Sequence, residues 1–170
     1  MRAVIYYSRS GENYVNGQLK QLSKGNTMVV AEKIADYLEA ELIRLIPKKD
    51  YPDDYQEMVE LAEQEKKEQK HPEYQAIIQD ISNYDELFIG YPNWWGTFPQ
   101  VIATFLKQQE LSGKTIYPFC THEGSAMGTS VSDMIRLCPN AKIETGLAVR
   151  GSKAAVSDKT IANWLNHLIK

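Results

Sequence analysis

The alternation of short apolar runs with amphipathic segments constrains the fold of this chain more than any other feature. Runs rich in β-branched and aromatic residues predict strands at Ala3–Tyr7, Glu41–Ile46, Glu86–Tyr91, Thr115–Cys120 and Lys142–Val149. Five repeats of a strand followed by a helix predict parallel strands, because each new strand can be reached only through a crossover connection.

Apolar residues at helical spacing predict five helices between and after these strands. They are Met28–Glu39, Asp53–Gln69, a helix after Thr97, Gly128–Leu137, and a last helix opened by Ser157 or Asp158. Right-handed crossovers place helices on both faces of one open sheet. A closed eight-stranded barrel needs about 200 residues or more, and this chain has 170. We therefore predict a three-layer α/β/α sandwich with a five-stranded parallel sheet, whose order is 2-1-3-4-5 along the chain.

Length and composition indicate one globular domain over residues 1–170. Hydrophobic residues make up 43% of the chain and charged residues 24%, which suits a chain with a buried core. The net charge of −3 provides no basic field for nucleic-acid phosphates. No apolar stretch reaches the roughly 18 residues of a membrane span, and two cysteines are too few for a secreted disulfide framework. We expect a cytoplasmic protein that binds neither nucleic acid nor membranes.

Polar residues follow the first strand, at the edge of the sheet where such folds bind ligands. That edge lies beyond the carboxyl ends of the strands, where the winding of the sheet reverses. Ser8 and Ser10 come directly after the first strand, and Asn26 and Thr27 stand at the start of the following helix. Their side chains and the free N–H groups of a helix N-terminus suit an anion such as phosphate.

Two further loops are expected to reach the same edge. The loop after the third strand contains Pro92, Asn93, Trp94, Trp95 and Gly96, and the loop after the fourth contains Thr121, His122, Glu123, Gly124 and Ser125. Paired tryptophans offer flat faces to a planar ring, and the glycines let the backbone approach such a ring closely. A phosphate at one end and a flat heterocycle at the other describe a mononucleotide.

These loops resemble those of the flavodoxin family, in its subgroup with a Trp-Trp-Gly-Thr loop and a Thr-His-Glu-Gly-Ser loop. The resemblance covers nearly the whole chain, and the uninterrupted fifth strand suggests a short-chain member. It implies non-covalent binding of FMN, with the phosphate held by the loop that contains Ser8, Ser10, Asn26 and Thr27. It further implies that the 92–96 loop lies beside the isoalloxazine ring, where the Trp95–Gly96 peptide can reorient its carbonyl. The backbone of residues 121–125 would meet the pyrimidine edge.

Two features depart from the family's pattern. Residues 12–25 intervene in the phosphate loop, so that either Gly11 or Gly25 could occupy the family's glycine position. This insertion is either an ordered flap beside the phosphate or a floppy surface loop. The tyrosine that often covers the outer flavin face is also missing from the 121–125 loop, where His122 stands in that neighbourhood. The flavin ring is therefore expected to be less fully covered.

The resemblance implies an FMN-dependent electron-transfer protein of low potential, which meets redox partner proteins transiently. An FMN-dependent NAD(P)H:quinone or flavin reductase on the same fold is the alternative. The net charge of −3 weakens the electron-carrier hypothesis, because carriers usually dock through a strongly acidic face. Outer-sphere electron transfer requires no catalytic acid or base, and the spacing of His71 and His167 does not suit a metal site. We expect a monomer, and a dimer stays possible.

Overall fold

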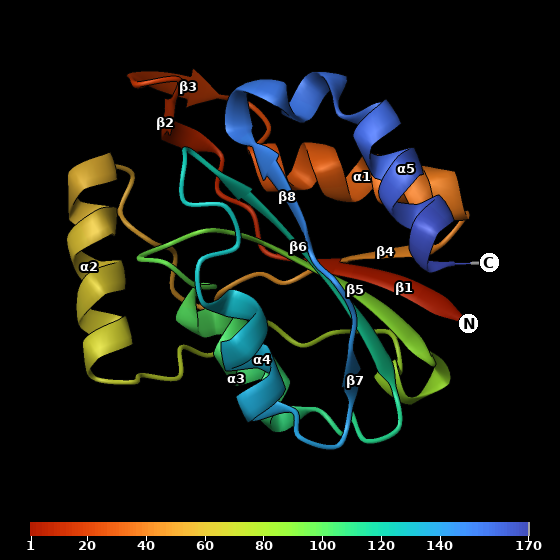
Figure 1. Cartoon of the computed structure of the whole chain (residues 1–170). Helices are drawn as coiled ribbons and strands as arrows, with labels where there is room; N and C mark the ends of the chain where they lie inside the picture. Colours follow the sequence, from red (N-terminus) through yellow and green to blue (C-terminus); the bar gives the residue numbers. More distant parts are fainter. Residues whose placement is uncertain (170) are drawn as a thin grey trace.

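The computed structural model describes residues 1–169, and Figure 1 shows a central sheet between two layers of helices. The sheet has the order β4-β1-β5-β6-β7, and β8 also pairs with β6. All of these pairings are parallel. The strands are β1 (Arg2–Tyr6), β4 (Glu41–Arg44), β5 (Glu86–Pro92), β6 (Thr115–His122), β7 (Lys142–Ile143) and β8 (Leu147–Arg150). With β7 and β8 counted as one strand, the predicted 2-1-3-4-5 order and the three-layer sandwich are confirmed.

Five helices alternate with these strands, as expected. They are α1 (Asn26–Leu38), α2 (Tyr55–Lys67), α3 (Gln100–Gln108), α4 (Ser130–Leu137) and α5 (Asp158–Leu168), with 3-10 turns at Ile81–Asn83 and Gly151–Val156. In Figure 1, α1 and α5 cover one face of the sheet, while α3 and α4 cover the other. No helix within residues 1–169 is long and apolar enough to cross a membrane.

The two faces of β1 show how this sheet builds two cores. Ala3 and Ile5 belong to the apolar cluster that includes buried residues of α2, α3 and α4. Val4 and Tyr6 belong to the cluster with α1 and α5. Successive strand residues point to opposite faces, so a strand covered on both faces is apolar throughout. For this reason the strand segments are continuous apolar runs in the sequence.

The fifth strand differs from its prediction, because Lys142–Val149 is not continuous. Ile143 pairs with Ile116 and Leu147 pairs with Phe119, so the outer strand carries one residue more than β6 over the same stretch. Pro118 lies in β6 between these two pairings and has no N–H to donate to a neighbouring strand. The interruption is therefore a short bulge, with no inserted loop.

The insertion at residues 12–25 contains an ordered hairpin. Its strands β2 (Gly11–Val15) and β3 (Gln18–Leu22) pair antiparallel around Asn16 and Gly17. Both turn residues have positive φ, 56° and 79°, as the tight hairpin turn favoured by Asn-Gly requires. The sequence had left an ordered flap and a floppy loop as alternatives, and the structure has the ordered form.

Candidate functional site

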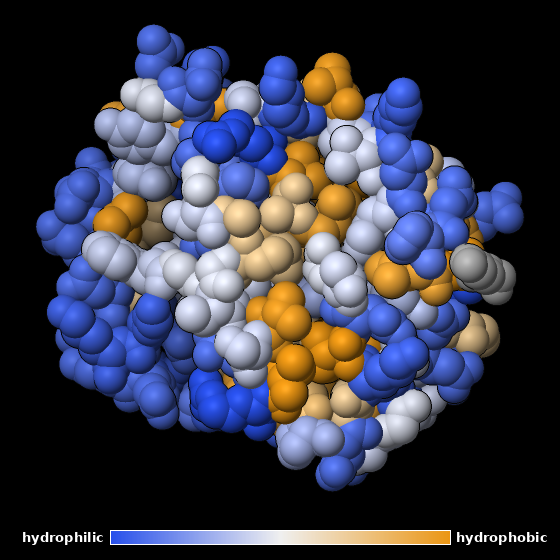
Figure 2. Space-filling view, in the orientation of Figure 1, coloured by the Kyte–Doolittle hydropathy of each residue, from blue (hydrophilic) through white to orange (hydrophobic). Residues whose placement is uncertain are grey.

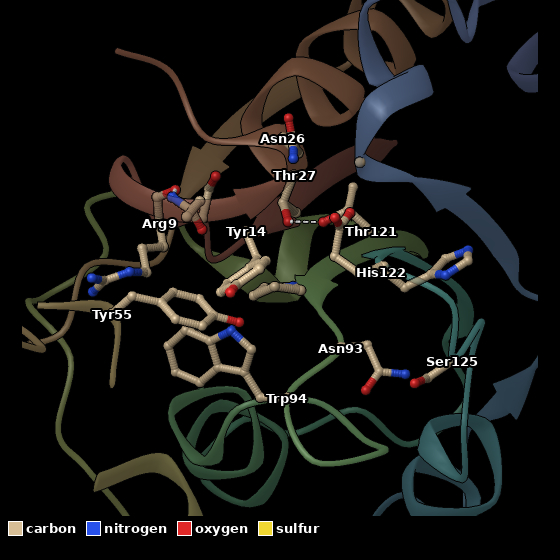
Figure 3. A pocket seen from close by; sticks show the side chains of 15 residues that line it. Arg9, Tyr14, Asn26, Thr27, Tyr55, Asn93, Trp94, Thr121, His122 and Ser125 are labelled. Carbon is tan, nitrogen blue, oxygen red and sulfur yellow. Dashed lines mark hydrogen bonds between the residues drawn. The ribbon is translucent and has the colours of Figure 1, made fainter. Parts of the chain in front are cut away.

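A cavity of about 150 Å³ opens at the carboxyl ends of β1, β5 and β6 (Figure 3). All three predicted loops contribute to its wall. The predicted site residues that line it are Ser8, Asn26, Thr27, Pro92, Asn93, Trp94, Thr121, His122, Glu123 and Ser125. The parallel strands therefore bring these segments together although they lie far apart in the sequence.

Four predicted residues lie outside this cavity wall. Trp95 and Gly96 line an adjoining cavity of about 210 Å³, which shares Tyr55, Asn93, Trp94 and Ser125 with the first. Ser10 lines a separate cavity of about 280 Å³ next to β4. Gly124 lines neither cavity of the site, and its N–H donates to Nδ1 of His122 at 2.9 Å. The two adjoining cavities together reach the roughly 300 Å³ at which small-molecule sites begin.

The N-terminus of α1 forms the end of the cavity where backbone donors are free. The Ser8 hydroxyl accepts the Met28 N–H at 3.0 Å, so it occupies one of the free donors of the first helical turn. The N–H groups of Asn26 and Thr27 have no acceptor within residues 1–169. Two backbone donors at the positive end of a helix dipole thus remain for an anion.

A buried pair of hydroxyls joins this end to the next loop. Thr27 Oγ1 and Thr121 Oγ1 lie 2.7 Å apart, and both residues are buried. One hydrogen of the two hydroxyls makes this bond, which leaves the other hydrogen as a donor. The dashed line in Figure 3 marks the bond between the two hydroxyls. The pair therefore adds a third neutral donor beside the two N–H groups.

Gly25 is the glycine that closes the loop between β1 and α1. A Cβ on Gly25 would lie 2.3 Å from Ser8 Oγ and 2.4 Å from the Arg9 carbonyl oxygen, so its backbone lies directly against the end of β1. Gly11 has open space around its Cα and a φ of +83°, which suits the first residue of the hairpin. The loop thus closes at Gly25 as if the hairpin were absent.

Trp94 forms the aromatic wall of the cavity, and two tyrosines fix its orientation. Its ring centroid lies 4.9 Å from that of Tyr51 and 5.4 Å from that of Tyr7, with both contacts edge-on. Edge-to-face packing of this kind is favourable for aromatic rings. The indole therefore cannot rotate freely, and it presents a fixed surface to the cavity.

The second tryptophan contacts α2. The Trp95 indole N–H donates to the Val59 carbonyl of α2 at 2.9 Å, and 44% of this residue stays exposed. Trp95 and Gly96 both have positive φ, 57° and 82°, as in a type I′ turn. Asn93 supports this turn, because its side chain accepts the Gly96 N–H at 3.0 Å and donates to the Ala126 carbonyl at 2.8 Å.

His122 and Glu123 occupy the far wall. Burial and the nearby Arg150 guanidinium lower the pKa of His122 below its usual value of 6.5, so the imidazole is neutral at pH 7. Its Nδ1 accepts the Gly124 N–H, which leaves the ring proton on Nε2. The Glu123 carboxylate accepts the Asn16 N–H at 2.6 Å, so it holds the hairpin.

Sequence reasoning missed five residues of this wall. The cavity is also lined by Arg9, Asn13, Tyr14, Tyr55 and Gly151. Arg9 donates to the carbonyls of residues 52 and 53 at 2.8 Å, which fixes the segment before α2. Tyr14 lies in the insertion and Tyr55 opens α2, and neither has a local sequence signal that points to the cavity.

Gly151 allows two side chains of the wall to come together. A Cβ at this position would lie 2.6 Å from Asn26 Nδ2 and 2.8 Å from Glu123 Oε2. The site as a whole offers neutral hydrogen-bond donors at one end and an indole at the other. Within residues 1–169, no group of three or more potential metal ligands is present.

Comparisons with known proteins agree with this architecture. A sequence model of the family described as flavodoxin matches residues 19–168. The crystal structure of a candidate flavoprotein from Bacteroides eggerthii has 26% sequence identity, a TM-score of 0.80, and coverage of 99% of this chain and 98% of its own. No curated protein sequence matches.

Two further solved structures show the range of proteins with this fold. A flavoprotein from Lactobacillus acidophilus, solved in complex with FMN, has 25% identity, a TM-score of 0.69, and coverage of 96% of this chain and 97% of its own. An NADH:FMN oxidoreductase has 12% identity and a TM-score of 0.53, over 98% of this chain and 84% of its own; that likeness supports the fold alone. Because the family match spans most of the sequence, this chain belongs to the flavodoxin family.

Proposed function

We propose that the protein binds FMN in this cavity and transfers electrons between redox partner proteins. The observation that carries the proposal is the pairing of an anion-binding helix end with a fixed indole across one two-part cavity. The family match and the FMN complex of the Lactobacillus acidophilus flavoprotein support the choice of this mononucleotide. When bound, FMN supplies the redox chemistry, and the protein sets its position and potential.

The anion end suits the phosphate of FMN. The N–H groups of Asn26 and Thr27 and the Thr27–Thr121 hydroxyl pair would donate to its oxygens. Helix N-termini bind phosphate in this way without a cationic side chain. Arg9 does not serve as that cation, because its guanidinium donates to the carbonyls of residues 52 and 53.

The aromatic end suits the isoalloxazine ring. Trp94 would cover one face of the ring, since Tyr7 and Tyr51 hold the indole in place. The neighbouring loop residues offer neutral groups, such as the Asn93 amide and the neutral His122 imidazole. Negative charge on the reduced ring would gain little from such groups, so we expect a low reduction potential.

The cover on the cavity favours the carrier over a reductase. A hydride-transferring enzyme needs space for a second ring above the flavin. Tyr14 and Tyr55 both line the cavity (Figure 3), and their ring centroids lie 5.2 Å apart. The side of the cavity next to the exposed Trp95 is then the side from which electrons would leave a bound flavin.

The surface beside Trp95 is a candidate docking face for a redox partner. The Trp95 indole N–H donates to the Val59 carbonyl of α2, and Lys66 Nζ donates to the Trp95 carbonyl. The surface over α2 is predominantly hydrophilic (Figure 2), and the helix carries Glu57, Glu60 and Glu63. A hydrophilic, charged surface of this kind suits transient contacts.

The two cysteines bear on the compartment. Cys120 and Cys138 are both buried free thiols, and burial raises their pKa values to about 12 and about 11. Unpaired cysteines of this kind suit a reducing environment. We propose a cytoplasmic protein that acts as a monomer.

Anaerobic potentiometric titration of the FMN-loaded protein distinguishes the carrier from the reductase. Two resolved one-electron potentials would support the carrier. A single two-electron step, together with NAD(P)H-driven reduction of a quinone or of free flavin, would support the reductase instead. Failure to bind FMN would contradict both.

A further inference from the structure

The β2–β3 hairpin leaves and re-enters the fold at the mouth of the cofactor cavity. Its first residue, Gly11, follows the end of β1 by five positions, and the chain returns at Gly25, which lies against Ser8 and Arg9. Any ligand at the α1 N-terminus therefore lies next to the hairpin. Asn13 and Tyr14 of β2 form part of the cavity wall.

Two carboxylates hold the hairpin across this mouth. At its base, Glu12 Oε1 accepts the Tyr55 N–H at 2.9 Å, at the start of α2. At its tip, Glu123 Oε1 accepts the Asn16 N–H at 2.6 Å. The hairpin thus spans the distance from α2 to the loop after β6, with one anchor at each side of the cavity.

Beyond these anchors, the hairpin has two hydrogen bonds with Arg9 at its base and buries little of its own surface. Of its ten strand residues, only Val15 is buried, and four of the five residues of β3 are exposed. An isolated two-stranded hairpin is only marginally stable in water. Its ordered position therefore depends on the anchors and on contacts with the cavity, and such segments open locally at low free-energy cost.

Tyr14 is the side chain that the hairpin presents to the cavity. Its ring lies 5.2 Å from the ring of Tyr55 at an interplanar angle of 57°, and 41% of the residue is exposed. In Figure 3 the Tyr14 side chain extends over the cavity between Tyr55 and Thr121. A ligand beneath it would cover much of the exposed ring.

We propose that the hairpin is a strap that retains the bound cofactor, with Tyr14 as the contacting residue and Glu123 as the residue that positions the strap. This inference rests on the proposed FMN binding. It gives the insertion a role, because the strap supplies the aromatic cover that the 121–125 loop lacks. It also assigns the Glu123 carboxylate to the hairpin tip, where Oε1 accepts the Asn16 N–H.

The test is the FMN dissociation rate, measured by stopped flow as the recovery of free-flavin fluorescence. We expect Tyr14→Ala and Glu123→Ala each to raise this rate about tenfold, which corresponds to about 1.4 kcal/mol. Tyr14→Phe retains the ring and is expected to keep the wild-type rate. Gln21→Ala is the matched control, since it truncates an exposed side chain of the same hairpin outside the cavity wall.

Hydrogen exchange supplies a readout that does not require FMN. Glu123→Ala is expected to remove protection of the Asn16 amide, while amides of β5 and β6 stay protected. Wild-type dissociation rates in both alanine variants, with Asn16 still protected in Glu123→Ala, would overturn the strap and leave FMN binding intact. Failure of the wild-type protein to bind FMN would overturn the proposed function and the strap together.

Discussion

Replacement of Gly25 by alanine tests the closure of the phosphate loop most sharply, because two physical effects predict opposite signs. Gly25 has φ −63° and ψ 153°, which any residue adopts readily. With free space, alanine would stabilise the protein by about 0.4–1 kcal/mol, since it restricts the unfolded chain. The new Cβ would instead lie 2.3 Å from Ser8 Oγ and 2.4 Å from the Arg9 carbonyl oxygen.

The cost of this overlap follows from what must move. The Arg9 carbonyl belongs to the backbone at the end of β1, so it cannot turn aside as a flexible side chain could. Overpacking costs about 1–3 kcal/mol, and displacement of Ser8 removes its bond to the Met28 N–H, an N-cap interaction of about 1 kcal/mol. We therefore expect Gly25→Ala to lower the free energy of unfolding by about 2–4 kcal/mol.

Urea denaturation of the protein without FMN measures this change, because bound ligand would add stability by mass action. With a slope of about 2 kcal/mol per molar urea, the midpoint should fall by about 1–2 M at an unchanged slope. Gly11→Ala is the control: Gly11 has open space and a φ of +83°, so only backbone strain of about 1–2 kcal/mol is expected. A Gly25→Ala protein as stable as the wild type would refute the proposed closure.

Three further predictions concern the surroundings of the cavity. Burial raises the pKa of Glu65 above 4.5 despite the hydrogen bond from Tyr51. The stabilisation that protonated Glu65 provides is therefore fully present below pH 4.5 and is lost as the pH rises through the folded-state pKa. The melting temperature of Glu65→Gln should accordingly rise relative to that of the wild type between pH 4.5 and 7, and a constant difference would contradict this. Arg150→Gln should raise the pKa of His122, measured by NMR titration, because the guanidinium lowers it; an unchanged pKa would assign the whole shift to burial. Gly151→Ala should weaken FMN binding about tenfold (about 1.4 kcal/mol) in a fluorescence titration, because the new Cβ displaces the ends of the Asn26 and Glu123 side chains. Unchanged affinity would show that FMN binding does not depend on the positions of these two side chains.

The geometry of the turn opposes the reorientation of the Trp95–Gly96 peptide that the family resemblance implies. Reorientation of this peptide must break two bonds, the one from Lys66 to the Trp95 carbonyl and the one from the Gly96 N–H to Asn93. It would also convert a turn with two positive φ values into a type II′ turn, which favours glycine at the first central position. Trp95 occupies that position, so reorientation here carries a strain that a Gly-Gly turn would avoid.

The fold and the three loops could be predicted because they depend on local patterns. Continuous apolar runs and helical spacing defined strands and helices, and parallel topology then brought Thr27, Trp94 and Thr121 to one edge. The bulge opposite Pro118 could not be predicted, because it depends on which residue of β6 lies beside the outer strand.

Residues recruited from distant elements were also beyond prediction. The Ser8 hydroxyl, at the end of β1, accepts the Met28 N–H in the first turn of α1, although Ser8 lies 20 positions before Met28 in the sequence. Tyr55 reaches the cavity only because Arg9 and Glu12 fix the start of α2. Such contacts join segments that lie far apart in the sequence, and no local sequence pattern indicates that they meet.

The most direct test of the account is an NMR-monitored titration of FMN into the protein. We predict a 1:1 complex with quenched flavin fluorescence, in which the largest shifts occur at the Asn26 and Thr27 amides and at the Trp94 indole N–H. Spectra that do not change at saturating FMN, or shifts confined to residues outside this cavity, would contradict the central claim.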